Sequence, residues 1–255
     1  MQKLISFFLI LLSVIVSSQN IKVTYNVDNN GFSDVLENVY INNNYKISIK
    51  DSIPVKIGDQ SRLKADVVIA DKSKIYRNIV IDDLKKKDVY YTHTFKGQNF
   101  LVLDVLPDIK WKIDSKTKKK IGKYNCTKAT TTYRGTDIEA YFTTEIPVSL
   151  APNKISGLPG LVMEMRTFGE NYTIWSVKNI VYPYKGEINY SPKYINSLKR
   201  IDIKKLVQLI DEKNEDDFNI QQSKLKLPAG VKVASVSVTR INPRNMLETK
   251  FEWEK

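Results

Sequence analysis

The chain has 255 residues, with 40 Lys and Arg against 28 Asp and Glu, one His and one Cys. Hydrophobic residues make up 42% and charged residues 27% of it, which are the proportions of a folded protein and exclude wholesale disorder. The single Cys excludes an intrachain disulfide, and one His beside one Cys argues against a Cys/His zinc site and most histidine-based catalysis.

The first 18 residues have the composition of a secretory signal peptide. Lys3 gives a positive start, residues 4–16 are apolar apart from two serines, and Ser17 and Ser18 suit cleavage before Gln19. A helix of that length spans about 20 Å, short of the ~30 Å hydrocarbon core of a bilayer. We predict a signal peptide at residues 1–18, one β-rich domain at residues 19–255 and export, with the periplasm favoured over the cell surface or secretion.

The N-terminal half predicts a series of strands. Residues 21–27 alternate apolar and polar side chains, as a half-buried strand does. Three asparagines at residues 42–44 separate the alternating runs of residues 39–41 and 45–49, which predicts a hairpin. Further strands are predicted at residues 65–70, 75–81, 89–95 and 100–105. The last of these is apolar at nearly every position, as in a central strand covered on both faces.

The C-terminal half continues this pattern. Alternation predicts strands at residues 138–146, 161–167, 172–181, 231–239 and 249–253. A helix is predicted after Asp202, a suitable N-cap, and a shorter one after Ser191 and Pro192. The fold class is therefore α+β and mainly antiparallel β, with one large curved sheet, a half-barrel or open barrel-like structure, and one or two helices packed on it.

The formal net charge of +12 raises the question of a nucleic-acid partner. The lysine clusters at residues 85–87 and 118–120 lie between strand-like runs, where charged turn residues are expected. No recognition-helix or zinc-finger pattern accompanies them. We interpret the charge as a solvated basic surface, with attraction to acidic envelope polymers or anionic lipid as the alternative.

The most informative residues form an ordered series between residues 111 and 164. The series reads Trp111, Cys126, Arg134, Gly135, Glu145, Pro147, Gly157, Leu158, Pro159, Gly160, Leu161 and Glu164. It resembles the GLPGLI family of exported proteins from Bacteroidetes, named for a Gly-Leu-Pro-Gly-Leu-Ile segment in which Val162 here replaces Ile. The resemblance brings no established activity with it, so the roles of these residues have to be argued from their chemistry.

The segment around Pro159 has two interpretations. Pro159 and Gly160 suit the two central positions of a type II turn, in which Gly160 would take a positive φ. Leu161, Met163 and Met165 would then enter the core, with Val162 and Glu164 on the other face. The structural interpretation is a fixed entry into a strand. The functional one is a rigid rim beside a ligand cleft, with residues 147–156 as its lid.

Catalytic candidates are few. Cys126 and His93 are the only Cys and His, and a nucleophile pair would need both, although a buried thiol and a packed histidine are the expected states. Glycoside hydrolysis needs two neighbouring carboxyl groups. Glu145 and Glu164 could form such a pair by approaching across the sheet.

We predict an exported envelope protein that is a non-enzymatic binding or accessory module, with a concave apolar surface for a lipid, a peptide or an outer-membrane partner protein. The alternative is a hydrolase that uses Glu145 and Glu164, or the Cys126/His93 pair. No catalytic, cofactor-binding or metal-binding residue is assigned, the residues of the series are given a structural role, and neither a cofactor nor a nucleic-acid partner is predicted. No transmembrane span is predicted in the mature chain.

Overall fold

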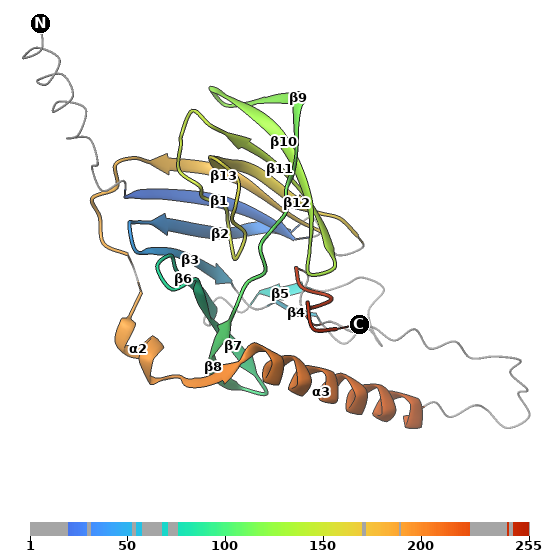
Figure 1. Cartoon of the computed structure of the whole chain (residues 1–255). Helices are drawn as coiled ribbons and strands as arrows, with labels where there is room; N and C mark the ends of the chain where they lie inside the picture. The colour runs from blue at the N-terminus through green and yellow to red at the C-terminus, as the bar shows by residue number, and fades with distance from the viewer. Residues whose placement is uncertain are drawn as a thin grey trace, which may run out of the picture.

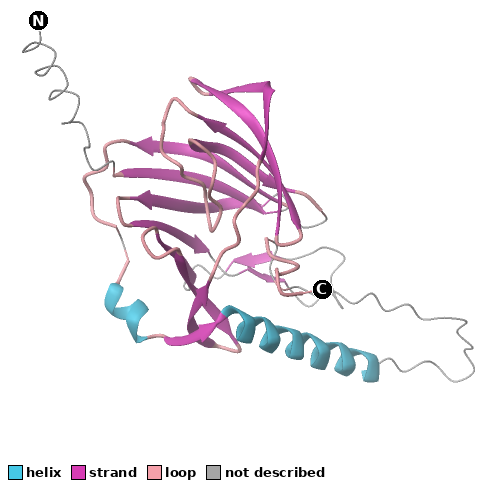
Figure 2. Cartoon of the chain, in the orientation of Figure 1, coloured by secondary structure: helices cyan, strands magenta, loops and turns pink. Residues whose placement is uncertain are grey.

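The computed structural model describes residues 20–29, 32–52, 55–57, 68–70, 76–169, 172–188, 190–224, 244 and 247–254. Within these ranges, one open sheet of twelve strands is accompanied by two helices and a two-stranded sheet. Figures 1 and 2 show how these elements are arranged. The predicted fold class is confirmed. Among the described helices, none is long and apolar enough to cross a membrane.

The elements have the following bounds in chain order. They are β1 (Ile21–Asn29), β2 (Phe32–Ile41), β3 (Tyr45–Ser52), β4 (Val55–Ile57), β5 (Val68–Ala70), β6 (Tyr76–Asp83), β7 (Asp88–Phe95), β8 (Gln98–Asp104), β9 (Lys112–Ile121), β10 (Tyr124–Tyr133), β11 (Thr136–Thr143), β12 (Leu161–Thr167), β13 (Thr173–Val181), α2 (Pro192–Ser197), β14 (Lys199–Asp202) and α3 (Ile203–Lys224).

The large sheet has the strand order β14-β8-β7-β6-β3-β2-β1-β13-β12-β11-β10-β9. Its strands pair antiparallel except for β14, which joins the edge beside β8 in parallel. The central pairing of β1 with β13 joins the strands from β1 to β8 to those from β9 to β13, so segments distant in sequence share one sheet. Figure 1 shows that this sheet is strongly curved.

Most predicted strands agree with the structure, including the β2–β3 hairpin across Asn42 to Asn44. Two predictions are wrong. Lys118 to Lys120 lie inside edge strand β9, whose exposed side chains hide the period-2 signal. Residues 249–253 form no strand but pass over the turn between β10 and β11, where Arg134 O accepts hydrogen bonds from Thr249 N and Lys250 N. The strand predicted at residues 231–239 lies outside the described residues.

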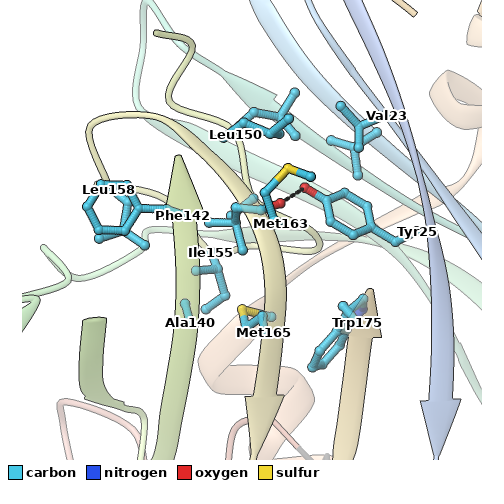
Figure 3. Close-up of a cluster of buried hydrophobic side chains, with 14 of the residues drawn as sticks. Val23, Tyr25, Ala140, Phe142, Leu150, Ile155, Leu158, Met163, Met165 and Trp175 are labelled. Carbon is cyan, nitrogen blue, oxygen red and sulfur yellow. Dashed lines mark hydrogen bonds between the residues drawn. The ribbon is translucent and has the colours of Figure 1, made fainter. Parts of the chain in front are cut away.

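Alternation along each strand separates an inner from an outer face of the sheet. On β1, Ile21, Val23, Tyr25 and Val27 are fully buried on the inner face. They join Met165 and Trp175 from β12 and β13 in the largest core (Figure 3). Each such side chain contributes roughly 1.5–3 kcal/mol by leaving water. The inner face of this half of the sheet is therefore the centre of the fold.

Two smaller cores lie at the other half of the sheet. The outer-face core contains Tyr40, Ile47 and Leu101, and the short helix α2 covers it with Ile195. The other core forms where Leu206 and Val207 of α3 pack on Val102 of β8. Both helices begin as predicted, because Ser191 Oγ accepts a hydrogen bond from Tyr194 N and Asp202 Oδ1 accepts one from Lys204 N.

Candidate functional site

The loop from β11 to β12, residues 144–160, fills the space over the inner face, and we call it the plug loop. Its Leu150, Ile155 and Leu158 are at most 3% exposed and pack in the main core, near Tyr25 and Met163 (Figure 3). Two backbone hydrogen bonds, Val162 N to Leu150 O and Leu161 N to Ile146 O, join it to the start of β12. The plug loop therefore belongs to the core of the protein.

The predicted type II turn at Pro159 and Gly160 is wrong. Gly160 N donates to Leu158 O at 2.9 Å, which is the hydrogen bond of a three-residue γ-turn, and Gly160 is not among the residues with positive φ. Glycine is required there for another reason. A Cβ at Gly160 would lie 2.1 Å from Thr143 O, so the turn and the end of β11 touch through their backbones.

Val162 also differs from its predicted position. A β-bulge between Tyr141 and Phe142 shifts the register, so Val162 faces Phe142 and is fully buried. Glu164 pairs with Tyr141 and lies on the outer face, as predicted. The bulge cannot be read from the apolar pattern, because residues 161–163 are all hydrophobic.

Trp111 and Gly157, two members of the series, meet at the start of β9. Trp111 Nε1 donates to Ser156 O at 2.8 Å, and a Cβ at Gly157 would lie 3.5 Å from the same nitrogen. Gly157 has a φ of 93°, a backbone conformation that favours glycine. The indole thus holds the exit of the plug loop.

Polar side chains beneath the plug loop hold its backbone. Glu37 of β2 is 1% exposed and accepts hydrogen bonds from Asn153 N at 2.6 Å and from Trp175 Nε1 at 2.9 Å. Lys46 of β3 donates to Ile155 O at 2.8 Å, and burial lowers the pKa of its ammonium group although the charges of Asp82 and Glu37 oppose that shift. The sequence offered no signal for these contacts, which join residues more than 100 positions apart.

The plug loop contributes Lys154 to a buried charge cluster, which consists of Asp104, Arg134, Lys154, Glu248 and Glu252. Arg134 donates both terminal nitrogens to the carboxylate of Asp104, at 2.8 and 2.9 Å. Lys154 Nζ bridges Asp104 and Glu248 at 2.9 and 2.8 Å. The side chains of Asp104 and Arg134 are 0% exposed, whereas that of Glu252 is 40% exposed at the rim. The cluster is thus closed to a substrate.

Opposite charges stabilise the ionised forms inside this cluster. Burial by itself would raise the pKa of the Asp104 carboxyl, but hydrogen bonds from Arg134 and the charge of Lys154 outweigh it and hold that pKa below its usual range. Lys154 also lies 3.8 Å from the centre of the Tyr91 ring. Burial, followed by the charges of Glu248 and Asp104, raises the pKa of Tyr91. Tyr91 therefore stays neutral beside the cluster.

The cluster explains the Arg134 and Gly135 pair of the series. Arg134 sits in the turn between β10 and β11, whereas Asp104 ends β8 near the opposite end of the strand order. Gly135 has a φ of 81°, and a Cβ there would lie 2.5 Å from Thr249 Oγ1. Sequence reasoning found Arg134 but missed its partners, since no motif marks Asp104 or Glu248.

A second group of charged residues lies on the outer face, where water reaches it, and we call it the outer carboxylate site. It contains Lys119, Glu145 and Glu164, and Cys126, the cross-strand partner of Lys119, is fully buried in the main core beside it. Lys119 Nζ donates to both oxygens of Glu164, at 2.7 and 2.8 Å. Glu145 is exposed, and its Oε1 accepts a hydrogen bond from Asn125 N at 2.8 Å.

The charges of this site affect the pKa of the neighbouring Cys126 thiol. Burial raises the pKa of Cys126. The charges of Glu145 and Glu164 raise it as well, while a backbone hydrogen bond at Ile121 and the charge of Lys119 act in the opposite direction. Glu145 is hydrogen-bonded to Asn125 and Glu164 to Lys119, so both carboxylates lie beside the β9–β10 hairpin. The raised pKa keeps the Cys126 thiol protonated and weakly nucleophilic.

Cys126 and His93 are not brought together. His93 lies on β7 opposite Phe100, and Cys126 lies on β10, which is near the other end of the strand order. No hydrogen bond joins the two within the described part of the chain. Burial, and then the charge of Lys154, lower the pKa of His93, which therefore belongs to the surroundings of the buried charge cluster. The nucleophile pair has no geometric support.

Pro147 is exposed at the start of the plug loop, whereas Leu158 and Leu161 are buried in the main core. Among the residues that the structure describes, no group of three or more His, Cys, Asp or Glu side chains has the arrangement of a metal site.

Comparison with known proteins indicates a family other than the one suggested by the motif. The family model for the PNGase F-II N-terminal domain, described as "N-glycanase peptide, N-terminal domain", matches residues 103–202. This range contains the series from Trp111 to Glu164, and the match gives no support to the GLPGLI resemblance. No curated protein matches the chain.

Two solved structures of PNGF-II are similar to this chain. The structure in space group C2 is 16% identical with a TM-score of 0.48, and the alignment covers 72% of this chain and 31% of that one. The structure in space group P2₁ is 14% identical with a TM-score of 0.50, over 74% and 32%. The second likeness shows a shared fold. The chain spans about a third of the length of these structures.

These findings correct the main functional prediction. A non-enzymatic module with a concave apolar surface is wrong, because the family match is to an N-glycanase and favours the hydrolase alternative. The structure adds a physical reason. The plug loop, with Leu150, Ile155 and Leu158, occupies the inner apolar surface on which a ligand was expected to bind.

Proposed function

We propose that this protein acts as an N-glycanase-like glycosidase, with N-glycosylated peptides as its substrates. The observation that carries the proposal is the family match over residues 103–202, which span the plug loop, most of the charged residues described above and the outer carboxylate site. The shared fold with PNGF-II supports it.

The accessible carboxylates are the groups that such a reaction needs. Hydrolysis of a glycosidic linkage commonly uses one carboxyl group to protonate the leaving group and another to activate water or form a covalent bond. Glu145 is exposed and the side chain of Glu164 is 26% exposed, so both can meet a substrate. Asp104 and Glu248 are sealed in the buried charge cluster and cannot.

Lys119 completes the proposed arrangement. It holds the Glu164 carboxylate with two hydrogen bonds and lies 4.9 Å from the centre of the Tyr141 ring. These contacts let Lys119 hold the Glu164 carboxylate in one orientation. The same ammonium group can donate a hydrogen bond to a negative charge that develops on the substrate. We assign Glu164 and Glu145 as the reacting carboxylates and Lys119 as the positioning residue.

The test is release of glycan from an N-glycosylated peptide by the purified full chain, followed by mass spectrometry. We expect the single variants Glu145→Gln and Glu164→Gln to lose activity about 100-fold or more, because each removes a proton-transfer group while keeping its shape. Lys119→Gln should raise KM or lower kcat less severely, since it acts through Glu164.

Glu139 provides a matched control. Its carboxylate pairs with Lys128 at 2.7 Å, two residues along β11 from Tyr141, and it is partly buried like Glu164. Glu139→Gln should retain the activity of the unmodified chain. Absence of glycan release by the unmodified chain would overturn the proposal. Equal activity in the Glu139, Glu145 and Glu164 variants would show that Glu145 and Glu164 are not the reacting carboxylates.

A further inference from the structure

A groove on the outer face of the sheet, distant from the outer carboxylate site in strand order, has the features of a binding site. It consists of two adjoining cavities of about 250 and 200 Å³, which share Tyr90, Leu101 and Arg200. Strands β6, β7, β8 and β14 form its floor, and α2 with the segment before it forms a wall. Cavities of this order admit one or two sugar rings.

Three tyrosines border the larger cavity. They are Tyr45 at the start of β3, Tyr90 in β7 and Tyr190 before α2. Tyr45 is 40% exposed, so its ring is accessible to a ligand in the cavity. A tyrosine offers an apolar ring face and a polar hydroxyl, which match the C–H face and the hydroxyl groups of a sugar.

The polar groups of the groove supply both donors and acceptors. Arg200 and Asn196 have side chains with no hydrogen-bond or ion-pair partner among the described residues, and both line the larger cavity. Asp83 is 7% exposed, and its Oδ1 is held by the backbone N–H groups of Lys85 and Lys86. Lys86, which also lines the larger cavity, forms an ion pair with Asp83 at 4.0 Å, and Asp202 lines the smaller cavity. With Arg200 and Lys86 the two cavities carry two positive and two negative side chains, a balance that suits a neutral polar ligand better than a simple anion.

The floor adds an apolar element. Leu101 and Ile195 are each 4% exposed in the outer-face core and also line the larger cavity, together with Ile81. A methyl group set against these side chains would be stabilised by leaving water. An acetamido group combines such a methyl with a carbonyl that can accept from Arg200 and an N–H that can donate to Asp83.

We propose that this groove binds an N-acetylhexosamine unit of a glycan, with a tyrosine against the sugar face and the acetamido group between Arg200 and the Leu101 floor. This inference rests on the proposed function for the choice of a glycan as the ligand. It assigns the groove to holding the glycan, while bond cleavage belongs to the outer carboxylate site.

The experiment is a titration of the full chain with N,N′-diacetylchitobiose, followed by NMR, with cellobiose as the matched sugar that lacks the acetamido groups. We expect the acetylated disaccharide to bind at least tenfold more tightly. Arg200→Gln and Tyr45→Ala should weaken its binding at least tenfold, because each removes a proposed contact with the sugar. Both side chains are exposed, so both variants should keep the fold. Arg166→Gln, an exposed arginine on β12, is the control and should bind normally.

The outcomes separate this inference from the proposed function. Neither disaccharide contains a linkage to peptide, so binding does not depend on hydrolysis, and Glu164→Gln should bind as well as the unmodified chain. Binding without glycan release would overturn the proposed function alone. Equal affinity for the two sugars, no binding, or unchanged binding in both groove variants would overturn the inference about the groove.

Discussion

Two groups of charged side chains lie near the two ends of β10. The buried charge cluster includes Arg134 after β10, and the outer carboxylate site includes Lys119 just before it. The buried charge cluster joins Asp104, Arg134 and Lys154 with side chains at most 4% exposed. The outer carboxylate site pairs Lys119 with Glu164, with side chains 42% and 26% exposed. The ion pairs have similar distances but differ in their exposure to water. Burial makes the inner pairs part of the fold, whereas exposure leaves the outer pair available to a substrate.

The difference should be largest when one cation of the buried cluster is removed. Arg134→Met leaves the carboxylates of Asp104 and Glu248 with Lys154 as their remaining buried cation, and we expect a loss of about 3–5 kcal/mol in the free energy of unfolding. Urea denaturation measures it. Arg166→Met is the control, because Arg166 is exposed and stacks on Phe168, and it should change stability by roughly 0.5 kcal/mol. Equal losses would show that burial does not distinguish the two arginines.

The next largest effect concerns the plug loop, which connects the two groups. Gly160→Ala forces a methyl group against Thr143 O, and we expect a loss of about 1–3 kcal/mol from overpacking. Gly122→Ala is the matched control, because Gly122 has a φ of 59° and nothing lies within 4 Å of the added atom. Its loss of about 1 kcal/mol should come from backbone strain, without any steric clash. A smaller loss at Gly160 than at Gly122 would contradict the close backbone contact.

The pH dependence of stability should reveal the titration of His93, which lies near Lys154 of the buried charge cluster. Burial and Lys154 lower the pKa of His93 in the folded state, so between that pKa and about 6.5 the unfolded chain binds more protons than the folded one. Stability therefore falls as the pH drops below about 6.5, by at most ~1.4 kcal/mol per pH unit.

Thermal melts from pH 7.5 to pH 3 test this dependence. His93→Gln should flatten the slope near pH 6. It should keep a second loss below about pH 4, where the lowered pKa of Asp104 makes the folded cluster lose stability on protonation. An unchanged slope near pH 6 in the variant would assign that titration to another group.

The smallest effect is expected at the outer carboxylate site. Lys119→Gln and Glu164→Gln should each change the free energy of unfolding by less than about 1 kcal/mol, because an exposed ion pair contributes little to stability. Chemical denaturation beside the activity assay measures both properties. A loss near that of Arg134→Met would mean that the outer pair fixes the fold, and the two groups would no longer differ.

Period-2 alternation predicted most of the large sheet, because a half-buried strand must place every second side chain in the core. It failed where the core does not set the pattern. Strand β9 carries Lys118, Lys119 and Lys120 on an exposed edge, so its sequence has no apolar alternation. The bulge opposite Val162 is set by strand register, which local sequence does not contain.

The candidate sites were predictable only in part. Glu145 and Glu164 were singled out, and both are hydrogen-bonded to residues of the β9–β10 hairpin. Arg134 was known only as a family residue, because the buried carboxylates that explain it come from distant segments. The groove at Arg200 was missed entirely, since Tyr45, Tyr90 and Tyr190 are far apart in sequence and only the sheet order brings them together.

The buried charge cluster also has a consequence for the order of folding. Glu248 lies 94 residues from Lys154 and 114 from Arg134 along the chain, and Asp104 lies 30 residues on the other side of Arg134. Contacts of such long sequence separation form slowly, because the intervening chain must first lose its freedom. Arg134 cannot meet all its partners until β8, the β10–β11 turn and residues 247–254 have come together. We therefore expect the cluster to form late in folding, when its arginine and lysine meet the last carboxylate.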